Sequence, residues 1–177
     1  MSMVIASLAD HLDQLVVLAR FHHAEWSQVS RFTTIDQHVD KLRSRISLGP
    51  DRIPSTYILL IDGAVAGSVS LLQHDDIGDV RPDLSPWLAS LYVEPAHRRL
   101  GYGSSLVRNC IEQARRCGCS TLYLYTDTHS RFYERFGWRP IEYRASRGLD
   151  VTVMALPVGV DRQEAASFSA EHEPNQP

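Results

Sequence analysis

Residues 91–106 read LYVEPAHRRLGYGSSL. The run Trp87–Val93 has the apolar composition of a strand and is closed by Glu94-Pro95. From about Gly103 to Cys117, apolar residues recur at helical spacing. The stretch therefore predicts a strand, a short turn that contains arginines and glycines, and a helix that begins at the turn.

The turn has the features of an anion site. A helix start presents unpaired N–H groups and a partial positive charge, glycine lets a backbone approach a ligand closely, and arginine adds charge-assisted bonds. The dinucleotide fingerprint does not fit, because Leu106 stands where its third glycine would be, and no run has the P-loop spacing. A phosphate or pyrophosphate carried by another kind of ligand is therefore expected.

The turn resembles the acyl-CoA signature of the GNAT superfamily of N-acetyltransferases, [Q/R]-x-x-G-x-[G/A] after a strand that ends in V-x-P. The matching residues are Arg98, Gly101 and Gly103, preceded by Val93-Glu94-Pro95. Within the family, residues 86–93 look like a bacterial subgroup whose members mostly have no assigned acceptor.

A second motif follows at the spacing that the family shows. Residues 125–138 read YTDTHSRFYERFGW, which is similar to the family's short helix ending in [LF]-Y-x-x-[LF]-G-[FW]. The matching positions are Phe132, Tyr133, Phe136, Gly137 and Trp138. The family's usual Asn is absent, and Thr126 stands near its place. Together the two motifs extend the resemblance over about residues 53–156.

The order of the predicted elements agrees with this family. Helices are expected from Ser7 or Asp10 to about Trp26, from Thr34 or Asp36 to about Ile46, over 103–117 and over 130–136; strands over 57–61, 64–72, 87–93, 121–125, 140–143 and 151–156. The resemblance implies an α/β (α+β) fold with a mixed, mostly antiparallel, twisted sheet of six to seven strands, about four helices and a splayed central strand pair. We expect one domain over residues 1–157 and a polar, mobile tail over 158–177.

The resemblance also implies direct transfer of an acetyl group from acetyl-CoA, as co-substrate, to an amine, without a metal. Backbone N–H groups from Arg99 to Ser104 would hold the diphosphate, and the splayed strand would pair with the pantetheine. The expected cofactor-binding residues are Leu91, Tyr92, Val93, Arg98, Arg99, Gly101, Tyr102, Gly103, Ser104 and Thr126.

Two residues are expected to move protons. Tyr133 is the candidate general acid, because its hydroxyl can protonate the departing thiolate. Glu94, at the end of the splayed strand, is the candidate base. The alternatives for the base are His23, Glu25, His74, Asp75 and Asp76.

Composition limits the partners. The 177 residues are 44% hydrophobic and 22% charged, with a net charge of -3, so the chain is globular and lacks the basic footprint of a protein that binds nucleic acid or an anionic membrane. The N-terminus has no long apolar run, from which we expect a cytoplasmic protein. Three cysteines imply neither a disulfide framework nor a zinc site.

The acceptor is expected to be a small-molecule or peptide amine, and a homodimer is left open. Aminoglycosides, polyamines, amino acids, peptide N-termini and lysine side chains all remain candidates for it. Two other functions remain open as well: a non-catalytic acyl-CoA sensing or regulatory domain on the same fold, and an unrelated phosphate-binding enzyme.

Overall fold

A seven-stranded sheet runs through the molecule in the order β1-β2-β3-β4-β5-β7-β6. The computed structural model describes residues 2–46, 51–75, 81–146 and 148–159. The strands are β1 (Met3–Ser7), β2 (Ser55–Ile61), β3 (Ala64–Leu72), β4 (Trp87–Val93), β5 (Thr121–Thr126), β6 (Arg139–Ser146) and β7 (Leu149–Pro157); the α-helices are α1 (Leu15–Trp26), α2 (Ile35–Arg43), α3 (Tyr102–Arg116) and α4 (Ser130–Glu134). Neighbouring strands are antiparallel except β4 and β5, which are parallel. The predicted fold class is confirmed.

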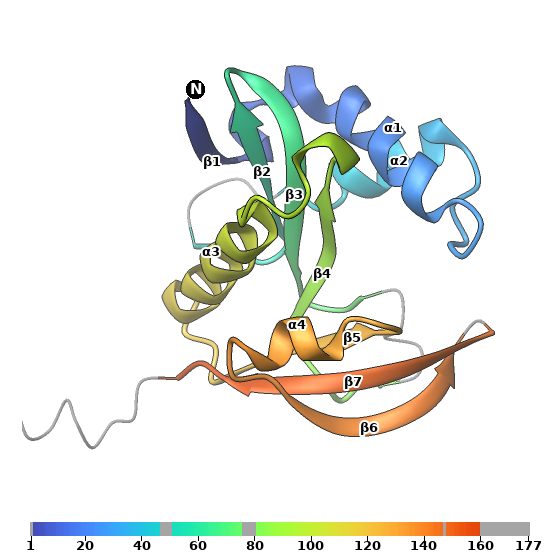
Figure 1. Cartoon of the computed structure of the whole chain (residues 1–177), viewed down its shortest axis with the longest axis vertical. Helices are drawn as coiled ribbons and strands as arrows, with labels where there is room; N and C mark the ends of the chain where they lie inside the picture. The colour runs from blue at the N-terminus through green and yellow to red at the C-terminus, as the bar shows by residue number, and fades with distance from the viewer. Residues whose placement is uncertain (1, 47–50, 76–80, 147, 160–177) are drawn as a thin grey trace, which may run out of the picture.

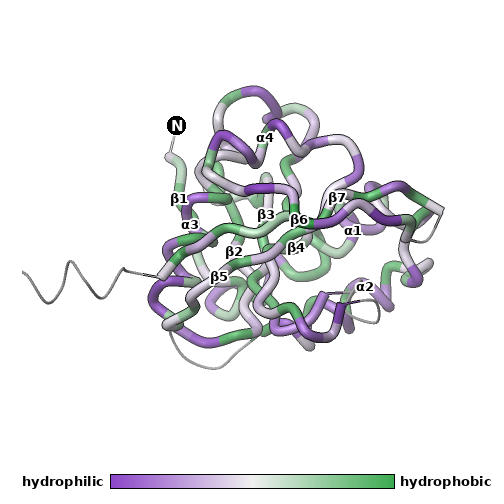
Figure 2. The backbone as a smooth tube through the Cα atoms, turned by 90° about the horizontal axis from the view of Figure 1, so that it is seen from below, coloured by the Kyte–Doolittle hydropathy of each residue, from purple (hydrophilic) through white to green (hydrophobic). Residues whose placement is uncertain are grey.

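Helices cover both faces of the β1–β4 half of the sheet, with α3 on one side and α1 and α2 on the other (Figure 1). Side chains alternate across β2, so that Leu59 packs into the core under α3 while Ile58 and Leu60 pack against α1 and α2. Apolar residues consequently follow these strands through the interior (Figure 2). Burial on both faces explains why β2 reads as an unbroken apolar run in the sequence.

Asp62-Gly63, between the predicted strands over 57–61 and 64–72, forms the hairpin turn that joins β2 to β3. Both residues have positive φ, 47° and 84°, as a two-residue turn of the primed type requires. The capped start of the second predicted helix is also present. Thr34 accepts a hydrogen bond from the N–H of Gln37, whose side chain bonds back to the Thr34 backbone.

The N-terminus differs from the expectation of one helix from Ser7 or Asp10 to Trp26. Residues Met3–Ser7 form strand β1, which pairs antiparallel with β2 along the sheet edge. Two 3-10 turns, Leu8–Asp10 and Leu12–Gln14, separate this strand from α1. The helical spacing of Leu8 and Leu12 misled the prediction, because Leu12 is 58% exposed and takes no part in a helical face.

The packed part of the chain continues past the expected domain boundary at residue 157. Val158 is buried in the core, and its N–H donates to the carbonyl of Ser120. Gly49-Pro50, which would end the second predicted helix, residues 76–80 and the expected tail from residue 160 onward lie outside the described residues.

Candidate active site

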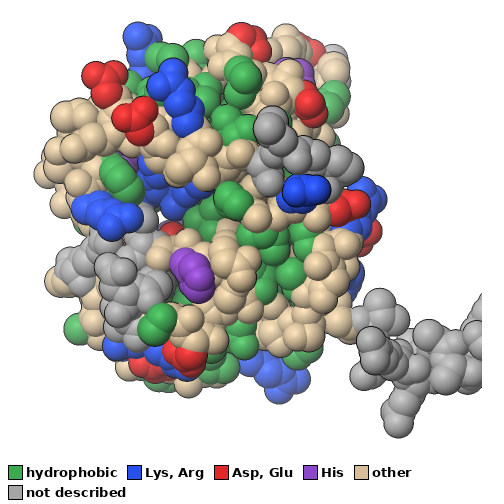
Figure 3. Space-filling view, turned by 180° about the vertical axis from the view of Figure 1, so that it is seen from behind, with side chains coloured by type: hydrophobic (Ala, Val, Ile, Leu, Met, Phe, Trp, Pro, Cys, Tyr) green, Lys and Arg blue, Asp and Glu red, His purple; other side chains and the backbone are tan. Residues whose placement is uncertain are grey.

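Strands β4 and β5 part immediately after they meet. Their register holds one pair, Trp87 with Tyr123, and the Tyr123 N–H donates to the carbonyl of Pro86. Beyond this point a cavity of about 470 Å³ opens between the two strands. Its lining residues are Glu25, Trp26, Val29, Ser30, Lys41, Asp75, Leu88, Ala89, Ser90, Leu91, Tyr125, Thr126, Asp127, His129, Tyr133, Ser146, Leu149 and Val151. The space-filling view shows this hollow between the two halves of the molecule (Figure 3).

Tyr133 reaches the cavity from α4. Its ring packs edge-on against Phe132 and Trp138, with centroids 5.0 and 5.8 Å away, and the residue is 8% exposed. Burial raises the pKa of its hydroxyl well above the ordinary value. Among the described residues this hydroxyl has no hydrogen-bond partner. Tyr133 is therefore a protonated donor that faces the cavity.

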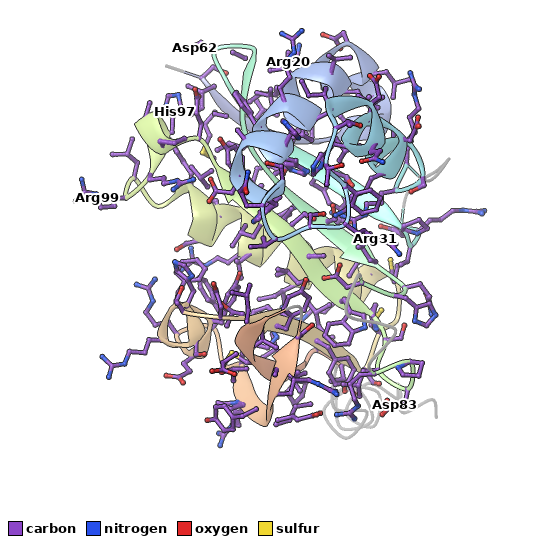
Figure 4. All side chains as sticks on the ribbon, turned by 90° about the vertical axis from the view of Figure 1, so that its right-hand side faces the viewer. Arg20, Arg31, Asp62, Asp83, His97 and Arg99 are labelled. Atoms are coloured by element: carbon purple, nitrogen blue, oxygen red, sulfur yellow. The ribbon has the colours of Figure 1, made fainter. Side chains whose placement is uncertain are left out.

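The predicted anion site has the expected backbone. Gly101, with φ of 86°, precedes α3, and no side chain caps the helix start. Within the described part of the chain, no backbone N–H from Arg99 to Ser104 donates a hydrogen bond. Arg99 extends from the turn into solvent (Figure 4). The turn thus presents unpaired donors and an exposed cation at its rim, as a phosphate site needs.

The side chain of Arg98 is already engaged. Its Nε donates to the Val93 carbonyl at 2.8 Å, and its Nη2 donates to Glu25 Oε2 at 2.8 Å. It therefore ties the turn to the end of α1, and the backbone N–H groups are left as the free donors.

The other predicted cofactor-binding residues take different places. Leu91 and Thr126 line the cavity from the two parted strands. Tyr92 is buried on the opposite face, stacked on Phe21 of α1. Thr126 also accepts a hydrogen bond from the His129 N–H at 3.1 Å, so its hydroxyl holds the turn before α4.

Val93, at the end of β4, and Tyr102, the first residue of α3, are partly buried and pack against the core under α3. Gly103 begins the first turn of α3, where a Cβ would come within 3.8 Å of Val93 and 3.7 Å of Phe132. Both are ordinary van der Waals distances, so a Cβ at Gly103 would fit without displacing either side chain.

The candidate bases separate into two groups. Glu25 and Asp75 line the cavity, whereas Glu94, His23 and His74 are absent from its lining. Glu94 instead lies near His97, with Oε2 3.6 Å from Nε2. Asp76 falls outside the described residues. The cavity therefore contains Tyr133 and two of the sequence's candidate carboxylates, but the favoured Glu94 is outside it.

Several cavity residues were not expected from the sequence. Asp127 and His129 come from the turn before α4, and Ser146 and Leu149 come from β6 and β7. No short motif marks them, because they become neighbours only when the sheet forms. Trp87 is fully buried in the core, whereas Trp26 lines the cavity.

Residues 18–138 match the profile of the Acetyltransferase (GNAT) family. The chain belongs to this family. Over 79 residues it is 30% identical to the uncharacterized N-acetyltransferase YjhQ of Escherichia coli strain K12, an alignment that covers 45% of this chain and 42% of that protein. The chain thus spans less than half the length of that curated relative.

Solved structures of other family members share the fold. The putative acetyltransferase yncA from Salmonella typhimurium, solved with acetyl-CoA, superposes with a TM-score of 0.69 at 20% identity, covering 89% of this chain and 95% of that one. An aminoglycoside 6'-N-acetyltransferase complexed with coenzyme A gives 0.68 at 15% identity, with coverages of 88% and 97%.

Over the described residues, no three His, Cys, Asp or Glu side chains are grouped so that they could hold a metal ion. No helix within that same part of the chain combines the length and the apolar character that crossing a membrane requires.

Proposed function

We propose that this protein transfers the acetyl group of acetyl-CoA to a primary amine of a small molecule or peptide, by direct attack in a ternary complex. The observation that carries the proposal is the cavity between the parted strands β4 and β5, into which Tyr133 projects. Acetyl-CoA would enter beside α3 and α4, and the amine would enter beside α1 and α2. The residues present fit this co-substrate, because the uncapped start of α3 suits a diphosphate.

Donor binding would rely on the backbone. The N–H groups from Arg99 to Ser104 would bind the diphosphate, while the unpaired edge of β4 at Leu91 and that of β5 at Thr126 would flank the pantetheine. Backbone donors that are already in place lose little conformational entropy when a ligand binds.

In the reaction, the amine nitrogen attacks the thioester carbonyl carbon, and the carbon–sulfur bond breaks. The sulfur takes the Tyr133 proton, which solvent later replaces; overall, an ammonium and acetyl-CoA give an amide, CoA thiol and one proton. Burial raises the pKa of Tyr133, so its hydroxyl stays protonated at neutral pH. The same low-dielectric surroundings disfavour a bare thiolate, which favours proton transfer as the bond breaks.

Glu25 is the carboxylate that we assign as base. It lines the cavity from the last turn of α1, and its partner Arg98 orients it. A half-exposed carboxylate can take the amine proton directly or through water. Asp75 is a weaker candidate because its side chain is 7% exposed and lies 3.7 Å from Arg45 Nη2. Glu94 remains the prediction from sequence and is tested beside Glu25 below.

The test is thiol release from acetyl-CoA with a panel of amines: spermidine, kanamycin, free amino acids and a peptide with a free N-terminus. We expect at least one amine to release CoA thiol, and mass spectrometry to show a single added acetyl group on that amine. Calorimetry with CoA and with ATP runs in parallel. Tight CoA binding without thiol release for any amine would favour the sensing domain, and binding of ATP but not CoA would favour another phosphate enzyme.

A further inference from the structure

Strand β4 contains a bulge in the wall of the cavity. The β3–β4 register passes from Ser70 with Ala89 to Ser68 with Tyr92, so Ser90 and Leu91 have no register partner in β3, and the described pairing with β5 ends at Trp87. Ser90 has φ of 51°, a left-handed conformation that is unfavourable for a serine. Both residues line the cavity. The bulge is thus a strained piece of backbone that faces the site of acetyl transfer.

Arg45, just beyond α2, holds the side chain of Ser90. Its Nη1 donates to Ser90 Oγ at 2.8 Å, and its Nη2 lies 3.7 Å from Asp75 Oδ1. The Arg45 and Asp75 side chains are 8% and 7% exposed. The fork of one buried guanidinium therefore spans the bulge and the segment that follows β3.

Ser68 and His22 hold the backbone of Ser90. The Ser68 hydroxyl donates to the Ser90 carbonyl at 3.4 Å and lies 2.9 Å from His22 Nε2. The bond to the Ser90 carbonyl uses the Ser68 hydroxyl proton, so His22 would complete the chain as the tautomer that donates through Nε2–H. His22 is 1% exposed, and burial, followed by the nearby charge of Lys41, lowers its pKa. A neutral His22 with its proton on Nε2 completes this chain of bonds.

We propose that His22, Arg45, Ser68 and Asp75, here called the Ser90 clamp, are positioning residues that hold the bulge so that the Ser90–Leu91 backbone polarises the thioester carbonyl. The inference rests on the proposed function. A buried ion pair seldom stabilises a fold more than apolar residues of similar size, and a positive φ at serine costs stability. The buried Arg45–Asp75 pair and the positive φ both concern Ser90 in the cavity wall. We therefore infer that they serve the function of the cavity rather than the stability of the fold.

The variant that separates function from stability is Ser90→Gly. Glycine adopts φ of 51° without strain but cannot bond Arg45, so the melting temperature should stay the same or rise while kcat falls at least about tenfold. The KM for acetyl-CoA should change less than kcat. The matched control is Asp62→Gly, which relieves a φ of 47° and loses the bond that Asp62 Oδ1 accepts from the Ser2 N–H, at the β2–β3 hairpin far from the cavity (Figure 4).

Two substitutions at Arg45 test whether this residue acts on kcat through its hydrogen bond to Ser90. Arg45→Lys keeps the charge but cannot reach Ser90 and Asp75 together, so it should recover only part of the kcat that Arg45→Met loses. The double variant of Arg45→Met and Ser90→Gly should be no slower than the slower single variant. Losses in kcat that multiply would show that Arg45 does not act through Ser90.

An infrared measurement tests the clamp without any acceptor. The carbonyl stretch of bound acetyl-CoA, labelled with ¹³C at the carbonyl, should shift to lower frequency on the wild-type protein relative to water, and Ser90→Gly should lose most of this shift. An equal shift in both proteins, or an unchanged kcat in Ser90→Gly, would overturn the clamp. Absence of thiol release by the wild-type protein would instead overturn the proposed function, and the infrared comparison would still decide the clamp.

Discussion

The proposed donor side and the proposed acceptor side of the site are built differently. The proposed donor side combines the turn at residues 98–104, which lies outside the cavity lining, with Tyr133 of helix α4, and the turn presents backbone N–H groups that have no partner among the described residues. The acceptor side draws on α1, α2, the segment after β3 and the β6–β7 hairpin. Its carboxylates are already paired, Glu25 with Arg98 and Asp75 with Arg45.

This difference indicates how each side selects its ligand. Unpaired donors at a helix start bind an anion whatever else that anion carries. Paired charges attract a cation only weakly, so the acceptor side would select by shape and by short-range contacts. The following predictions test the two sides, beginning with the largest effect.

Tyr133→Phe should lower kcat by about 10²- to 10³-fold, because the departing thiolate loses its proton donor. Calorimetric affinity for CoA should change less than about threefold, since the ring still packs against Phe132 and Trp138. Tyr143→Phe is the control, at a residue 76% exposed on β6. Equal kcat for Tyr133→Phe and wild type with a saturating amine would remove Tyr133 from the mechanism.

Glu25→Gln should lower kcat/KM for the amine by about 10- to 100-fold, because the base is lost while its size is kept. Glu94→Gln should change it by less than about threefold, since Glu94 lies outside the cavity lining. Steady-state kinetics with the most active amine of the panel measure both. The reverse order of effects would make Glu94 the base and move the acceptor to the turn beyond β4.

Gly101→Ala should weaken CoA binding by about tenfold, or 1.4 kcal/mol, because alanine disfavours φ of 86° and displaces the N–H groups that start α3. Gly118→Ala imposes the same kind of strain at the other end of that helix, where φ is 73°. Calorimetry should therefore give reduced stability for both variants but weaker CoA binding only for Gly101→Ala. Equal CoA affinities in the two variants would argue against the turn as the diphosphate site.

His22→Gln should change stability rather than donor binding. Burial lowers the pKa of His22, so the unfolded chain binds its proton more readily, and the protein loses stability as pH falls below about 6.5. Between pH 7.5 and 5.5, the wild-type melting temperature should fall by about 2–4 °C more than that of the variant. His129→Gln, at a side chain 71% exposed, should retain the wild-type pH dependence. If the melting temperature of His22→Gln fell with pH as steeply as that of the wild type, His22 would not be the group that sets this pH dependence.

The sequence predicted most of the fold because the deciding signals are local. The dipeptide Asp62-Gly63 between two apolar runs favours a two-residue hairpin turn. Thr34, followed three positions later by Gln37, favours a helix start. Strand β1 was missed because its five residues are half exposed and become a strand only by pairing with β2. An edge strand of this kind depends on its neighbour more than on its own composition.

The sequence by itself determined the family, a helix start within one residue of the observed Tyr102 and the short helix that carries Tyr133, since each depends on residues within a few positions of one another. Tertiary structure alone decided which carboxylates share the cavity. It brought Glu25 to Arg98, 73 positions later, and Arg45 to Ser90, 45 positions later. Backbone groups can bind a phosphate from one turn of chain, whereas a site made of side chains exists only when packing brings distant residues into contact.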